Sequence, residues 1–118
     1  MPDISQDCTL EVIDEAVILS NGLVGISFNT RLGHLTFTDL ITGNDIFSRS
    51  YVQVQTDQCM FDSRNMTYKA FSTLDFEDDM GQGKAVVFRL QDPDKRGEMN
   101  LKLSVIRSLP CYMCSVQF

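Results

Sequence analysis

The chain has 118 residues, of which 43% are apolar and 22% charged, a composition typical of one soluble globular domain. Its formal net charge is −6 and its ten Lys and Arg residues are scattered, which argues against a nucleic-acid backbone or an anionic membrane as partner. No apolar run approaches the roughly 18 residues of a membrane span, and the first seven residues lack the features of a signal peptide. We therefore expect a cytoplasmic protein if the chain is complete as written. If it was cut from a longer protein, the compartment stays open.

The cysteines are too few for a disulfide-stapled secreted domain, so we expect them to be mostly reduced. They are Cys8, Cys59, Cys111 and Cys114. Cys111 and Cys114 form a CxxC in an extended segment, where residues three apart face opposite sides, a poor arrangement for one metal or one disulfide. A zinc site would need Cys8, Cys59 or His34 to converge on them. We expect neither a metal nor a cofactor.

Residues 9–19 fit either one helical face or two short strands. Asp14-Glu15 would break the strands, and the β-branched residues around it favour them. The Asn21-Gly22 pair that follows also needs an extended segment before it, because Asn-Gly is typical of a two-residue type I′ hairpin turn. We therefore predict two strands here.

A three-stranded meander is predicted over residues 19–44. Val24, Ile26 and Phe28 alternate with small or polar residues, so we expect them to point into the core together. A turn over 30–33 leads to an alternating segment at 35–39, and residues 42–45 close it with turn-forming side chains.

The remaining sequence continues with short alternating segments and turns. Residues 57–66 lose the alternation and are interpreted as a long connection. The expected strands are 50–56, 67–76, 84–91, 99–107 and 111–118. In the first of them Val52 and Val54 point inward, or Tyr51 does if the register is reversed. In total, about nine strands at this spacing predict an all-β fold, a meander-rich antiparallel β-sandwich. Residues 1–118 would be a single domain or a fragment of a larger one. A barrel with an apolar cavity is a less favoured alternative.

Two acidic turns could gather oxygen ligands for calcium. They are Asp75 to Asp79 and Asp92 to Glu98, and neither has EF-hand spacing. Solvated turns are the favoured reading, and calcium binding stays open. His34 lies beside a turn glycine without a G-x-S-x-G motif, which favours a surface or packing role. We name no catalytic residue.

Other polar and aromatic residues also have two readings. Asn65-Met66-Thr67 fits the N-glycosylation pattern, but without a signal peptide we expect no glycan there. Tyr51, Tyr68 and Tyr112 could stack on sugar rings. We favour burial with a satisfied hydroxyl for each, because the chain has no Trp to complete a sugar-binding platform.

Two stretches resemble a known family. Residues 17–44, VILSNGLVGISFNTRLGHLTFTDLITGN, resemble the opening strands of the β-sandwich that precedes the catalytic barrel in glycoside hydrolases such as melibiase-like α-galactosidases. Residues 83–118 resemble a later section of that domain, in which paired strands lead through Leu-Pro into a further strand. The family's sandwich is considerably longer than this chain.

The resemblance implies a non-catalytic N-terminal module that supports a catalytic barrel. The barrel and its catalytic aspartates have no counterpart in the chain, so no catalytic residue is transferred. The implied partners are carbohydrate or the catalytic barrel domain of a parent enzyme. The alternative is a stand-alone β-sandwich that binds a protein or carbohydrate, as lectins do.

The C-terminal segment, residues 111–118, alternates to its end with Tyr112, Cys114, Val116 and Phe118 on one face. It has neither charge nor proline to protect an open edge. Two expectations follow. Either the strand pairs within the chain, or the chain is a truncated product that forms a homo-oligomer through this strand.

Overall fold

The computed structural model describes residues 8–57, 60–79, 81–109 and 112–117. These residues form eleven strands and no helix, so the all-β prediction is confirmed, with eleven strands where about nine were expected. The described residues contain no helix that is long and apolar enough to cross a membrane.

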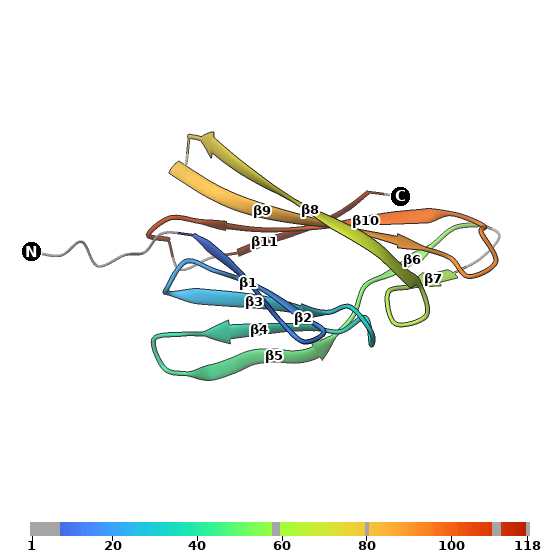
Figure 1. Ribbon diagram of the computed structural model, residues 1–118, viewed down its shortest axis with the longest axis horizontal. Coiled ribbons are helices and arrows are strands. Elements are labelled where there is room, and N and C mark those ends of the chain that lie inside the picture. The colour runs from blue at the N-terminus through green and yellow to red at the C-terminus, as the bar shows by residue number, and fades with distance from the viewer. Residues whose placement is uncertain (1–7, 58–59, 80, 110–111, 118) are drawn as a thin grey trace, which may run out of the picture.

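The first sheet is a five-stranded antiparallel meander in the order β1-β2-β3-β4-β5 (Figure 1). Its strands are β1 (Thr9–Ile13), β2 (Ala16–Ser20), β3 (Val24–Asn29), β4 (Leu35–Asp39) and β5 (Asn44–Ser50). The predicted break at Asp14-Glu15 is the β1–β2 turn, where Asp14 has a positive φ of 52°. The strand interpretation of residues 9–19 is therefore confirmed.

The second sheet has four antiparallel strands in the order β11-β10-β9-β8, and a two-stranded arm connects the two sheets. The sheet contains β8 (Thr67–Asp78), β9 (Gly81–Gln91), β10 (Glu98–Ile106) and β11 (Tyr112–Gln117), and the arm contains β6 (Gln53–Gln55) and β7 (Met60–Asp62). Each strand pairs antiparallel with a strand that is next to it in the sequence, as expected for short connections.

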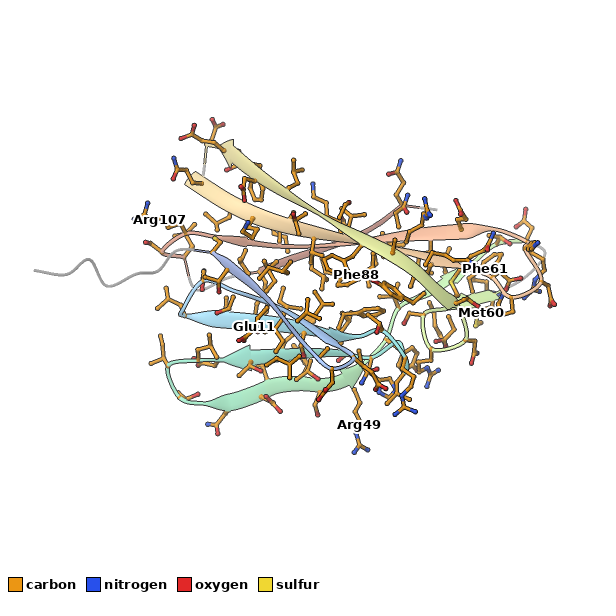
Figure 2. All side chains as sticks on the ribbon, in the orientation of Figure 1. Glu11, Arg49, Met60, Phe61, Phe88 and Arg107 are labelled. Carbon is orange, nitrogen blue, oxygen red and sulfur yellow. The ribbon has the colours of Figure 1, made fainter. Side chains whose placement is uncertain are left out.

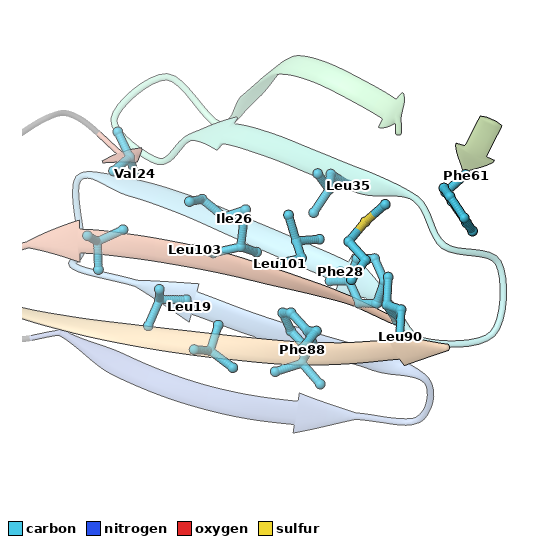
Figure 3. Packing of buried hydrophobic residues seen from close by; sticks show 14 residues of the cluster. Leu19, Val24, Ile26, Phe28, Leu35, Phe61, Phe88, Leu90, Leu101 and Leu103 are labelled. Atoms are coloured by element: carbon cyan, nitrogen blue, oxygen red, sulfur yellow. The ribbon is translucent and has the colours of Figure 1, made fainter. Parts of the chain in front are cut away.

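The core lies between the inner faces of the two sheets (Figure 3). Phe28 of β3 and Phe88 of β9 meet at its centre, with ring centroids 4.5 Å apart. The predicted inward residues of β3 are all buried, and so are the alternating apolar residues of β9 and β10: Val24, Ile26, Phe28, Val86, Phe88, Leu90, Met99, Leu101, Leu103 and Val105. Val52 and Val54 of the arm also pack against this core, as predicted.

The turn between β2 and β3 lies one residue later than predicted. Asn21 N–H donates to the Val24 carbonyl at 3.2 Å, so the two loop residues are Gly22 and Leu23. Gly22 has a positive φ of 86°, whereas Asn21 does not, and the predicted type I′ turn at Asn21-Gly22 is wrong. As a result, each residue of β2 pairs with a residue of β3 that lies two positions later than a turn at Asn21-Gly22 would give. Because side chains alternate with period two, the inward set is unchanged.

Asn21 has another role, which explains the shift. Its side-chain NH₂ donates to the Ile106 and Leu109 carbonyls, both at 2.7 Å, and its side-chain oxygen accepts from the Leu23 and Val24 amides, both at 2.9 Å. The residue is fully buried. It therefore connects the first sheet to the end of β10, and leaves the turn geometry to Gly22.

Two strands were not predicted as such. Residues 44–50 form β5, although 42–45 were expected to be a turn and the next strand was expected at 50–56. Its pairing with β4 has two register shifts, which remove the alternation from the sequence. Residues 60–62 form β7 inside the predicted connection, where Phe61 is the one buried apolar residue. A three-residue strand is too short to give a periodic signal.

The two sheets are offset from one another. β2 packs across from β9 and β10, and β3 packs across from β11. The first sheet continues beyond this contact through β4 to β5, which forms its outer border, away from the second sheet (Figure 1). Within the described residues, the side of the sandwich that β5 borders therefore has no facing strand from the second sheet.

Candidate interaction surface

We define the open side as the inner-face residues Phe37 of β4, Phe47 of β5, and Tyr112, Cys114 and Val116 of β11. Their orientation follows from strand pairing, because directly opposite residues point to the same face. Phe37 is opposite the buried Ile26 and also opposite Phe47. The three β11 residues are opposite Val105, Leu103 and Leu101, all fully buried.

The open side is apolar, and much of it is in contact with solvent. Phe37 packs edge-on against Tyr112 at 5.0 Å between ring centroids and against Phe47 at 6.0 Å. Phe47 nevertheless has 59% of its surface exposed, and Val116 has 37%. Side chains of this type on the inner face of a sandwich are normally covered by the opposite sheet.

The backbone edges beside this surface differ in regularity. Within the described residues, β5 and β11 each pair with one strand only, so each has an open edge. β5 is irregular because of its two register shifts, while β11 pairs with β10 over six residues without a shift. Residues 112–117 contain no charge and no proline, the usual features that protect an edge from added strands.

β11 places two titratable side chains on the open side, those of Tyr112 and Cys114. The Tyr112 hydroxyl is buried and makes no hydrogen bond within the described part of the chain. Burial, and secondarily the charge of Asp39, raises the pKa of Tyr112, and burial raises the pKa of the Cys114 thiol. Both groups therefore stay neutral near pH 7, and the open side stays uncharged along β11.

Each of the two acidic segments is engaged by a cation. The prediction that Asp75 to Asp79 form a turn is wrong, because residues 75–78 belong to β8 and pair with β9. Asp75 pairs with Lys84 at 2.8 Å, and Asp92 accepts two hydrogen bonds from the Arg96 guanidinium, both at 2.8 Å. The Arg96 side chain and two backbone amides lower the pKa of Asp92 to about 2. No group of three His, Cys, Asp or Glu residues among the described residues could hold a metal ion.

His34 and the described cysteines were the other candidate site residues. The His34 carbonyl accepts from the Asn29 amide at 2.9 Å and closes the turn before β4. Next to it, Gly33 has a φ of 76°, and a side chain there would collide with the Ser63 backbone. Cys8 and Cys114 form no disulfide among the described residues. Cys59 and Cys111 lie outside the described residues, so the predicted geometry of the CxxC stays a prediction.

The tyrosines divide into two groups. Tyr68 and Tyr112 pack against the core, as predicted, although the Tyr112 hydroxyl is not satisfied in the described structure. The predicted burial of Tyr51 is wrong, because 45% of its surface is exposed. The guanidinium of Arg64 covers one face of its ring, 3.5 Å from the centroid.

Arg64 belongs to a second candidate site that the sequence analysis missed. It donates two hydrogen bonds to the buried Asp62, at 2.7 and 3.0 Å, and Gln53 donates a third at 3.0 Å. The Arg64 side chain holds the pKa of Asp62 well below its usual range. This cluster lies beside Phe61, at the end of the molecule opposite Arg107 (Figure 2). The Asp-x-Arg spacing at 62–64 was the only sequence signal for it.

An open groove of about 650 Å³ lies at the other end, beside the β8–β9 hairpin. It is lined by Cys8, Asp75, Phe76, Glu77, Gln82, Gly83, Lys84 and Arg107. The Asp75 and Lys84 side chains in it are already paired with each other. The groove therefore has mixed charge and gives no preference for one class of ligand.

The open side is an exposed apolar surface on the inner faces of both sheets. Its residues are apolar or uncharged, and none has the geometry of a nucleophile with an adjacent base. Comparison of the chain with family models, with curated proteins and with solved structures finds no match.

Proposed function

We propose that the chain is a non-catalytic β-sandwich module of a carbohydrate-active enzyme, and that it supports a catalytic barrel supplied by a parent protein. Supporting evidence comes from the two stretches that resemble glycoside hydrolases. Residues 17–44 contain most of β2 to β4, and residues 83–118 contain most of β9 to β11. They supply most strands of the two facing sheets, so the resemblance covers the core of the fold.

The open side is the observation that carries the proposal. A freestanding sandwich normally covers the inner faces of both sheets, whereas here Phe47 and Val116 are on the inner faces and exposed. A module that is built to pack against another part of an enzyme has a reason to keep such a surface. A support role also agrees with the pairing of the acidic residues Asp75 and Asp92 with cations.

An activity assay tests the support role. We expect the purified chain to show no turnover of a panel of aryl α- and β-glycosides. Turnover that survives repurification and is abolished by Asp75→Asn, Asp92→Asn or another single carboxylate substitution would overturn the proposal, since the chain would then be a hydrolase itself.

A second candidate function, carbohydrate binding by the sandwich alone, is favoured by one observation. Tyr51 is exposed beside Arg64, Gln53 and Asp62, and an aromatic ring next to planar hydrogen-bonding groups can bind a sugar. Amide resonances followed during titration with mono- and oligosaccharides distinguish the two functions. A lectin would show shifts confined to residues near Tyr51 that are lost in Tyr51→Ala, while a support module would show an almost unchanged spectrum.

A further inference from the structure

We propose that the open side binds an extended strand of the parent enzyme, which adds to the edge of β11 and lies over the inner face of β4 and β5. The inference deepens the proposed function and rests on it for the source of the strand. It commits to one kind of occupant, namely an extended segment with alternating apolar side chains. Three features of the molecule lead to it.

The first feature is the space beside β11. Neighbouring strands are about 4.8 Å apart and packed sheets about 10 Å apart. Because β11 packs across from β3, a strand added next to β11 would lie above β4 and β5. Its inward side chains would contact Phe47, which the second sheet leaves exposed, and would lie beside the half-buried Phe37, which Tyr112 already contacts.

The second feature is the regularity of the β11 edge. An added strand gains main-chain hydrogen bonds only along an undistorted edge. β11 pairs with β10 in one unbroken register, whereas β5 has two register shifts. The other two edges of the sheets carry charge, with Glu11 on β1 and Asp75 among the acids of β8. The β11 edge is therefore the best template among the four.

The third feature is that symmetry disfavours a second copy of the chain as the occupant. Antiparallel pairing of β11 with β11 requires a two-fold axis perpendicular to the sheet, which keeps both layers in place. The β4 and β5 strands of the partner would then occupy the space of β4 and β5 of the first copy. A two-fold axis along the strands avoids this overlap. This second axis, however, turns the apolar face of the partner's β11 away from β4 and β5 of the first copy, and so leaves Phe47 uncovered.

A peptide tests the inference directly. The probe is a fluorescently labelled synthetic copy of β10, EMNLKLSVI, because this strand already pairs with β11 on its other edge and has alternating apolar residues. A peptide of the same composition in scrambled order is the control. We expect the β10 copy, and not the scrambled peptide, to raise anisotropy on titration with the full chain and to protect alternate amides of 112–117 from hydrogen exchange.

Matched variants locate the site. Val116 and Ser115 are adjacent on β11, opposite Leu101 and Lys102 respectively, so their side chains lie on different faces. Val116→Glu places a carboxylate on the inner face and should weaken peptide binding about tenfold or more, whereas Ser115→Glu should change it less than about twofold. Phe47→Asp should weaken peptide binding as much as Val116→Glu does. Phe47 lies on β5, whereas the backbone of the peptide pairs with β11, so this variant tests whether the peptide also lies over the first sheet.

Three results would overturn the inference. One is the absence of binding and of amide protection, and another is an equal loss of binding in Ser115→Glu and Val116→Glu. The third is a dimer of the native chain, seen by light scattering, that Val116→Glu dissociates, since a second copy would then occupy the edge. Failure of the peptide test leaves the support function standing. Turnover in the glycoside assay would overturn the support function without affecting strand addition.

Discussion

In the closed half of the sandwich the two sheets cover each other, whereas on the open side they do not. Both regions contain strands with alternating apolar residues. In the closed half, alternate residues of β3 and β10 such as Ile26 and Leu101 are fully buried, because each sheet covers the other. On the open side, β11 alternates in the same way, yet Val116 is 37% exposed. Alternation thus indicates which face points inward. It does not indicate whether anything lies opposite that face.

The largest expected effect is a difference in stability between substitutions on the two faces of β3, a strand of the closed half. Ile26 is fully buried between the sheets, while its neighbour Ser27 lies on the outer face opposite Ile18 and Thr36. Ile26→Asp should lower the free energy of unfolding by about 4 kcal/mol or more, because it buries an unpaired carboxylate. Ser27→Asp should cost less than about 1 kcal/mol. Urea unfolding of both variants at pH 7 measures the difference.

Similar unfolding midpoints for the two variants would contradict the assigned register of β3. If Ile26→Asp does not fold, Ile26→Ala is the milder substitute. It should still cost about 3 kcal/mol through the lost packing and the cavity left behind.

The next effect concerns the link between the sheets. Asn21→Ala removes two donors to the Ile106 and Leu109 carbonyls and an acceptor for two amides, all in buried or half-buried positions. We expect a loss of about 2 to 4 kcal/mol, because the carbonyls and amides lose their partners without access to water.

Asn21→Asp is the matched control, because it keeps the acceptor side and loses the donor side. It should destabilise the protein at pH 7 at least as much as Asn21→Ala, since its charge faces two carbonyl oxygens. A stability close to that of the native chain in both variants would show that residue 21 acts only as a turn residue.

The inward residues of the paired strands could be predicted because sheet alternation is a local property of the chain. The role of Asn21 could not, since its partners Ile106 and Leu109 are more than 80 residues away. β5 was missed because its two bulges disturb the alternation, and Phe61 because a three-residue strand has no period. The open side follows from the offset of the sheets, which depends on tertiary packing and has no signature in any one segment.

A smaller effect comes from the charged loop between β9 and β10. The pKa of Asp92 is lowered to about 2 by Arg96 and by backbone amides, whereas an unfolded aspartate has a pKa of about 3.9. The carboxylate therefore stabilises the fold above about pH 4, and this contribution is lost as the pH falls from about 4 toward 2. Asp92→Asn should be less stable than the native chain at pH 7, and the difference should shrink near pH 2.5.

Asp94→Asn serves as the control for this loop, because Asp94 is exposed on the same turn. Its difference from the native chain should be small at both pH values. If the stability difference of Asp92→Asn is the same at pH 7 and pH 2.5, the pairing with Arg96 contributes nothing to folding.

The smallest effect on stability is expected on the open side. Phe47→Ser removes a large aromatic side chain, but this side chain is 59% exposed and packs edge-on against the ring of Phe37. We expect a loss of at most about 1 kcal/mol, against about 3 to 5 kcal/mol for Phe28→Ala, whose ring is fully buried. Urea unfolding of the isolated chain measures both.

If Phe47→Ser costs as much as Phe28→Ala, the side chain is covered within the single chain and the open side is already closed. If the two differ as expected, Phe47 contributes little to the folding of this chain, and its aromatic surface stays available to a strand that binds there.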